Sequence, residues 1–220
     1  MDILEQNLQI PTAGIVLKAD AIVPGDARGV VLFVPGGGSW FRRRSRHVAG
    51  QMCDAGLGVV LAELITPNEA ERGTIELDGG PLASRAAALI DWVTRYPYAE
   101  GLGVGVYGTS TAVAPVLAAA AALPGKVQAV AVRGGRPDLA GQQLNRVYQP
   151  TLLIVGGDDA PALPRARETL GRLHGEARLK IVPGASHLFD EPGVLEQAAF
   201  LACEWFLLHL RPVARTPAHH

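Results

Sequence analysis

Apolar and polar positions alternate along this chain in the way expected of strands that are followed by helices. Short runs rich in β-branched residues recur between longer stretches rich in alanine and leucine. This alternation predicts a mostly parallel sheet with helices on both faces. The predicted strands span residues 3–9, 14–22, 29–35, 58–64, 102–107, 127–132, 151–156 and 178–182. The predicted helices span residues 45–55, 82–96, 111–122, 161–174 and 193–210.

The connections between these elements indicate a single domain without a substantial lid. The first two strands follow each other with no helix between them, so we expect an antiparallel pair. Residues 66–81 and 134–149 are polar and turn-rich, and both are predicted to be surface loops, the second holding at most one short helix. We expect one domain over residues 1–212. Residues 213–220, which end in two histidines, are expected to be a disordered or tag-like tail.

Composition and charge narrow the classes of partner. The chain has 220 residues, of which 48% are hydrophobic and 19% charged, as in ordinary globular proteins. A net charge of −1 provides no field to attract nucleic acid or anionic membranes. No run reaches the roughly 18 apolar residues of a membrane helix, and the two cysteines show no metal-ligand spacing. We expect a cytoplasmic monomer or homodimer without a metal or cofactor and with neither nucleic acid nor membrane as partner.

Residues 106–113 (VYGTSTAV) contain a candidate nucleophile. Ser110 follows a predicted strand and opens a predicted helix, which is the context of a nucleophile elbow. The strained turn of such an elbow requires small residues two positions before and after the serine. Gly108 and Ala112 meet that requirement. The alternative is that Ser110 caps the helix, a common role for serine.

An acid and a base follow the serine in the order typical of α/β-hydrolase triads. The strand TLLIVG leads into Asp158 and Asp159, and a turn-rich loop after the next strand carries His187. All three loops leave the carboxyl edge of the sheet, where ligand sites of open α/β sheets lie. Alternatively, the two aspartates cap the helix near Pro161, and the histidine is a solvated loop residue. Asp138 is a reserve candidate for the acid. Together the three loops favour a Ser-His-Asp triad.

A glycine-rich loop supplies the predicted oxyanion hole. Residues 35–40 (PGGGSW) follow the third predicted strand, and the glycines allow the backbone to come close to a substrate. We assign the two N–H donors to Gly37 and to Thr111, the residue after the serine. A phosphate-binding loop is disfavoured because the chain has neither G-x-G-x-x-G nor GKS or GKT.

Several residues near this edge are candidates for substrate binding. The segment WFRRRSRH places Trp40 and Arg44 beside the oxyanion loop, and RGGRPDLAG places Arg133 and Arg136 after the sixth strand. An arginine there can hold a substrate carboxylate or phosphate. The simpler interpretation is that most of these arginines are solvated.

Over nearly its whole length the chain resembles the dienelactone hydrolase-like branch of the α/β-hydrolases. The resemblance lies in VLFVPGGGS (31–39), YGTSTA (107–112), RGGRPDLAG (133–141), LLIVGGDD (152–159) and VPGASHLFDEPG (182–193). It implies an eight-stranded, mostly parallel α/β-hydrolase sheet without a substantial lid, a Ser-His-Asp hydrolase and no cofactor. Its GG-x-D pattern favours Asp159 over Asp158 as the acid.

Three departures from the family pattern bear on function. Enzymes that hydrolyse dienelactone use a cysteine where this chain has Ser110, which argues against that substrate. Pro35 stands where the oxyanion loop usually starts with histidine, and Ala112 replaces the last elbow glycine. We predict a serine hydrolase that cleaves a small-molecule ester or thioester. The alternative is a non-catalytic α/β-hydrolase-fold protein that binds a small molecule or a partner.

Overall fold

Eight strands form a single sheet in the structure, a computed structural model that describes residues 3–12, 14–36, 39–72 and 79–213. The strand order is β1-β2-β4-β3-β5-β6-β7-β8. The strands are β1 (Ile3–Thr12), β2 (Ile15–Pro24), β3 (Val30–Val34), β4 (Gly58–Ala62), β5 (Val104–Thr109), β6 (Ala129–Arg133), β7 (Thr151–Gly156) and β8 (Ala177–Val182). All eight lie where the periodicity predicts a strand.

The sheet is antiparallel at one end and parallel elsewhere. β1 pairs with β2 over its whole length, from Ile3 opposite Pro24 to Thr12 opposite Ile15. β2 also runs antiparallel to β4, whereas the pairs from β4 through β3, β5, β6 and β7 to β8 are parallel. The predicted edge hairpin and the mostly parallel sheet are therefore both confirmed.

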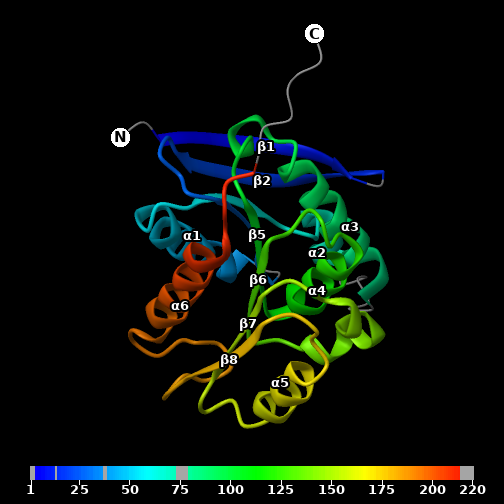
Figure 1. The fold of residues 1–220 in the computed structure, drawn as a ribbon, viewed down its shortest axis with the longest axis vertical. Coiled ribbons are helices and arrows are strands. Elements are labelled where there is room, and N and C mark those ends of the chain that lie inside the picture. The colour runs from blue at the N-terminus through cyan, green and yellow to red at the C-terminus, as the bar shows by residue number, and fades with distance from the viewer. Residues whose placement is uncertain (1–2, 13, 37–38, 73–78, 214–220) are drawn as a thin grey trace.

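Helices cover both faces of the sheet (Figure 1). They are α1 (Ser39–Asp54), α2 (Pro67–Arg72), α3 (Gly79–Val93), α4 (Val113–Ala122), α5 (Ala162–Leu170) and α6 (Val194–His209), with 3₁₀ turns η1 (Pro97–Ala99), η2 (Ser110–Ala112) and η3 (Pro137–Arg146). Helices α1 and α6 pack on one face, and α3, α4 and α5 pack on the other. All five residues of β3 are buried, because a central parallel strand is covered on both sides.

The predicted loop over residues 66–81 contains helical structure instead, whereas the second predicted loop holds a short helical turn. Residues 66–81 include α2 and the start of α3, and residues 73–78 lie outside the described residues. The missed signal is a capping box: the Glu69 N–H donates to Thr66 Oγ1 over 3.3 Å, and the Thr66 N–H donates to Glu69 Oε2 over 2.9 Å. Residues 134–149 contain the turn η3, which kinks at Gly141, where φ is 56°.

Two further expectations concern the C-terminal tail and the absence of a membrane helix or a lid. The expected tail, except for Val213, lies outside them. Within the described chain, no helix has both the length and the hydropathy needed to cross a bilayer, and no lid domain is inserted between strands.

Candidate active site

Ser110 occupies a strained turn between β5 and α4. Thr109 is still extended, at φ −130° and ψ 149°, and Ser110 then switches to a φ of +53°. A non-glycine residue in the left-handed region is uncommon and concentrates at functional sites. The turn η2 begins at Ser110 and has Thr109 as its N-cap, and α4 has Ala112 as its N-cap, so Ser110 is not a helix cap. The backbone has the geometry of an elbow.

Two glycines from other loops press directly on this elbow. A Cβ on Gly36, which follows β3, would lie 2.5 Å from the Ser110 Cβ. A Cβ on Gly135, which follows β6, would lie 2.2 Å from the Ser110 carbonyl oxygen, and Gly135 also has a φ of +69°. The Gly36 N–H donates to Thr109 Oγ1 over 3.3 Å. The three strand ends are therefore held together by contacts that leave no room for a methyl group.

His187 is paired with Asp159. The Nδ1 of His187 lies 2.6 Å from the Asp159 Oδ2, so in the tautomer with its proton on Nδ1 the imidazole donates to the carboxylate. Asp159 is 7% exposed, whereas the His187 side chain is 54% exposed. Backbone bonds connect the two loops: the Gly157 N–H donates to Val182 O over 2.8 Å, and the Asp158 N–H donates to Ala185 O over 3.0 Å.

The other two candidate acids have different surroundings. Asp158 is exposed. Asp138 pairs with Arg136 over 2.6 Å, and that hydrogen bond lowers the pKa of the Asp138 carboxyl. Of the three aspartates considered, Asp159 is the one that the structure places against His187.

Ser110 and His187 line one small pocket, together with Arg133, Gly134, Gly135, Leu188 and Phe189. Among the hydrogen bonds of the described residues, none joins Ser110 to His187. Such bonds are often long in the absence of substrate and tighten when it binds. The pocket brings a serine hydroxyl and a carboxylate-paired imidazole together at the carboxyl edge of the sheet.

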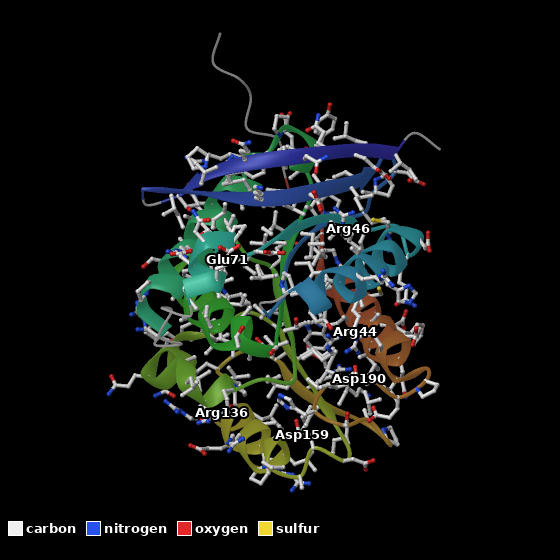
Figure 2. All side chains as sticks on the ribbon, turned by 180° about the vertical axis from the view of Figure 1, so that it is seen from behind. Arg44, Arg46, Glu71, Arg136, Asp159 and Asp190 are labelled. Carbon is white, nitrogen blue, oxygen red and sulfur yellow. The ribbon has the colours of Figure 1, made fainter. Side chains whose placement is uncertain are left out.

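The three candidate arginines have different environments. Arg44 donates to the Asp190 carboxylate and to the Phe189 carbonyl, and Figure 2 shows Arg44 on α1 beside Asp190. Arg136 is held by Asp138. Arg133 lines the pocket, is 9% exposed, and has its guanidinium carbon 5.2 Å from the centre of the Phe189 ring. Its Nη1 has no hydrogen-bond partner among the described residues.

The remaining predicted site residues are described only in part. Thr111 lies in η2, immediately after the serine. Gly37 lies outside the described residues, and so does the side chain of Trp40.

The comparisons with known proteins agree with this fold. No family model matches the chain. The crystal structure of dienelactone hydrolase from Anabaena variabilis shares 42% sequence identity, superposes with a TM-score of 0.91, and covers 96% of this chain and 100% of its own. The chain belongs to the dienelactone hydrolase family.

Other structures share the fold of this dienelactone hydrolase family member at low identity. A dienelactone hydrolase-like promiscuous phosphotriesterase from metagenomic libraries is 16% identical with a TM-score of 0.76, covering 96% of this chain and 100% of its own. An esterase of Pyrococcus furiosus is 15% identical with a TM-score of 0.75, covering 94% and 93%. Both show the α/β-hydrolase architecture.

The curated relatives are longer proteins. In two strains of Mycobacterium tuberculosis, a protein named "putative phosphoribosyl transferase" is 41% identical over 207 residues, which is 94% of this chain and 47% of the relative. This dienelactone hydrolase family chain therefore spans about half the length of the curated relatives it matches.

Sequence reasoning missed two residues that shape the site. Gly135 lies in the sequence between two candidate arginines, and the signal for its role is the Gly-Gly pair after a strand, which indicates a close backbone approach. Phe189 is 2% exposed and has a φ of +55°. No local pattern marks a phenylalanine for the left-handed region.

Metal and thiol chemistry find no support among the described residues. They contain no group of three histidine, cysteine or acidic side chains that could hold a metal ion. Cys53 and Cys203 are free and buried, and burial raises the pKa of each thiol to about 11. Both thiols are therefore protonated near neutral pH and are poor nucleophiles.

Proposed function

We propose that this chain is a serine hydrolase that cleaves small esters or thioesters through an acyl-enzyme. The observation that carries the proposal is the left-handed Ser110, which shares a pocket with a histidine already paired to a buried aspartate. A serine is a weak nucleophile until a base takes its proton, and a carboxylate keeps that base in the required tautomer. Membership in the dienelactone hydrolase family supports hydrolysis as the reaction class.

The reaction would proceed in two halves. Ser110 Oγ attacks the substrate carbonyl carbon while its proton passes to His187 Nε2, and Asp159 stabilises the imidazolium through Nδ1–H. The imidazolium then protonates the departing alcohol or thiol, which leaves the acyl group on Ser110. Water then attacks the acyl carbon while its proton passes to His187. The bond from that carbon to Ser110 Oγ breaks, His187 returns the proton to Oγ, and the carboxylic acid leaves. The N–H groups of Thr111 and Gly37 remain the predicted oxyanion donors.

Arg133 is the candidate for holding an anionic part of the substrate. Arg44 and Arg136 are engaged by neighbouring acids, whereas Arg133 lines the pocket and forms no ion pair with any described acid. A buried, unpaired guanidinium is costly, and a substrate carboxylate or phosphate would neutralise it. We expect Arg133→Met to raise KM for an anionic ester and to leave KM for a neutral ester within about twofold.

The name of the mycobacterial relatives does not define the activity of this chain. This chain corresponds to 47% of their length, and it matches the whole of a dienelactone hydrolase. We propose that any phosphoribosyl transfer by those relatives depends on their other half. Phosphoribosyl transfer catalysed by this chain alone would contradict that assignment.

Intact-mass analysis after treatment with a fluorophosphonate tests the hydrolase proposal. We expect a single adduct on the parent protein and none on Ser110→Ala. Ser84→Ala is the matched control, because Ser84 is an exposed serine on α3 that donates to the Gly80 carbonyl. Hydrolysis of p-nitrophenyl acetate should follow the same pattern. A folded parent protein that forms no adduct would contradict the proposal and favour the non-catalytic binding protein.

A further inference from the structure

The loop that carries His187 is folded into a compact turn over residues 186–191. The Phe189 N–H donates to Ser186 O over 3.2 Å, and the Ser186 N–H donates to Glu191 Oε2 over 3.0 Å. These two bonds close the turn around His187 from within. They do not attach it to the helices and strands that hold the serine.

Phe189 adopts a conformation that its own side chain disfavours. Its φ of +55° is one of two positive φ values among the described non-glycine residues, and the other belongs to Ser110. A strained residue keeps such a conformation only where its surroundings impose it. The ring is 2% exposed and lies over the Arg133 guanidinium, and the carbonyl accepts a hydrogen bond from Arg44.

Arg44 contacts the turn at two consecutive residues. One terminal nitrogen donates to the Phe189 carbonyl and the other to the Asp190 carboxylate. The Arg44 side chain is only 16% exposed, although Asp190 is 42% exposed. A planar guanidinium can make both bonds in one fixed geometry, which a lysine ammonium cannot reproduce.

The helix that carries Arg44 begins shortly after a glycine that contacts Ser110. Helix α1 starts at Ser39, three residues after Gly36, which contacts Ser110. Arg44 therefore connects the helix that follows the predicted oxyanion loop with the turn that carries the histidine. These two segments are more than 140 residues apart in sequence.

We propose that Arg44 is a positioning residue that holds Phe189 in its left-handed conformation and thereby keeps His187 aligned with Asp159 and Ser110. This inference rests on the proposed function in one respect, that His187 acts as the base for Ser110. Without Arg44, the turn relaxes at Phe189, and the imidazole two residues earlier loses its fixed orientation.

Two readouts on the full chain test this role. The first is the rate at which a fluorophosphonate labels Ser110, and the second is the His187 Nδ1 proton resonance in histidine-labelled protein, assigned with His187→Gln. Arg44→Gln should slow labelling roughly 10- to 100-fold, the range expected from a displacement of about 1 Å. It should also shift or broaden the Nδ1 resonance. Arg44→Lys should fall between Arg44→Gln and the parent protein.

Arg46→Gln is the matched control. Arg46 lies two residues further along α1 and pairs with Asp20 over 2.6 Å, so its removal also deletes an arginine and an ion pair. This variant should keep both readouts within twofold of the parent, and thermal melting should show that every variant is folded.

The outcomes separate the two proposals. If Arg44→Gln keeps the Nδ1 resonance of the parent, Arg44 has no positioning role, even if labelling is slower. If the parent protein is not labelled at all, the hydrolase proposal fails. The resonance then still decides whether Arg44 holds His187.

Discussion

The loop of Ser110 and the loop of His187 lie side by side, but different forces hold them. The serine elbow is enclosed by glycine backbone: Gly36 and Gly135 approach so closely that an added methyl group would overlap it. The histidine loop also begins against a glycine, since a Cβ on Gly156 would lie 2.3 Å from the Ala185 carbonyl oxygen. Beyond that point, Asp159 accepts a hydrogen bond from the imidazole and Arg44 donates to Phe189 and Asp190. Steric contact encloses the serine elbow, whereas directional hydrogen bonds hold the imidazole of His187 and the residues that follow it.

This difference predicts how each loop responds to substitutions and to salt. A side chain added at Gly135 would place its Cβ 2.2 Å from the Ser110 carbonyl oxygen, so the backbone must move for it to fit. Hydrogen bonds and ion pairs can be weakened in steps by a shorter side chain, by a lost charge or by salt. The serine side should therefore respond abruptly and the outer contacts of the histidine side gradually.

The largest expected loss of activity follows from removing the hydrogen bond between Asp159 and His187. Asp159→Asn removes the carboxylate that accepts from His187 Nδ1 and so favours the wrong imidazole tautomer. We expect kcat/KM for p-nitrophenyl acetate to fall by about 10³- to 10⁴-fold. Asp158→Asn is the matched control, because Asp158 is exposed, and it should change kcat/KM by less than about threefold. Equal losses in the two variants would contradict the assignment of Asp159.

The next effect tests the steric character of the elbow. Gly135→Ala puts a Cβ 2.2 Å from the Ser110 carbonyl at a φ of +69°. We expect Ser110 labelling to slow by about 100-fold or more, with a loss of about 2–4 kcal/mol in the free energy of unfolding.

Gly50→Ala is the control for Gly135→Ala. A Cβ at Gly50, inside α1, meets nothing within 4 Å. The change should stabilise the protein by about 0.5–1 kcal/mol, measured by urea unfolding. If Gly135→Ala labels as fast as the parent, the elbow has more freedom than steric exclusion allows.

A smaller effect is the response of the histidine loop to salt, because that loop is held in part by an ion pair. The Arg44–Asp190 pair is partly exposed, so raising NaCl from about 0.05 to 1 M should slow labelling of the parent about twofold. Arg44→Gln should lack that response, because it has no ion pair to screen. A parent protein insensitive to salt, or a variant equally sensitive, would show that the ion pair adds little to the positioning.

The smallest effect concerns a similar arginine contact remote from the site. Arg85 donates to the Leu64 carbonyl and to the Glu69 carboxylate, as Arg44 does at Phe189 and Asp190. The hydrogen bond from Arg85 lowers the pKa of Glu69 from 4.5 to about 2. Because the folded-state pKa is depressed, the stabilisation is present above pH 4.5 and is lost as the pH falls toward 2.

Glu69→Gln should therefore be less stable than the parent near neutral pH, and the difference should shrink below about pH 4.5. Chemical unfolding at several pH values measures it, with p-nitrophenyl acetate hydrolysis unchanged at neutral pH. A stability difference that is constant from pH 7 to pH 2 would mean that the carboxylate charge is not the cause.

Local patterns in the sequence are enough to predict the framework. The eight strands follow from periodicity, which is a local property. The same property predicts that one face of α3 presents Leu82, Ala86, Leu89 and either Trp92 or Val93, and in the structure Val93 is the buried one of the last two. The capping box at Thr66 is equally local, but the turn signals of the polar segment around it predict a loop.

The choice among neighbouring carboxylates cannot be derived from such patterns. Asp158 and Asp159 are adjacent, and residue spacing does not tell which one turns inward. In the structure Asp159 is buried against His187, while Asp158 is exposed. A resemblance to known enzymes favoured Asp159, but the physical reason is how two loops 28 residues apart pack together.

The sequence by itself determined which residues reach the carboxyl edge of the sheet, because strand and helix periods and the order of Ser110, Asp159 and His187 are written along the chain. Only the tertiary structure decided how those residues are held. The sequence makes Arg44 a candidate for substrate binding, and in the structure it donates to the Phe189 carbonyl. Gly135 packs directly against the Ser110 backbone. Both contacts join segments distant in sequence, so their energies depend on packing that no local pattern encodes.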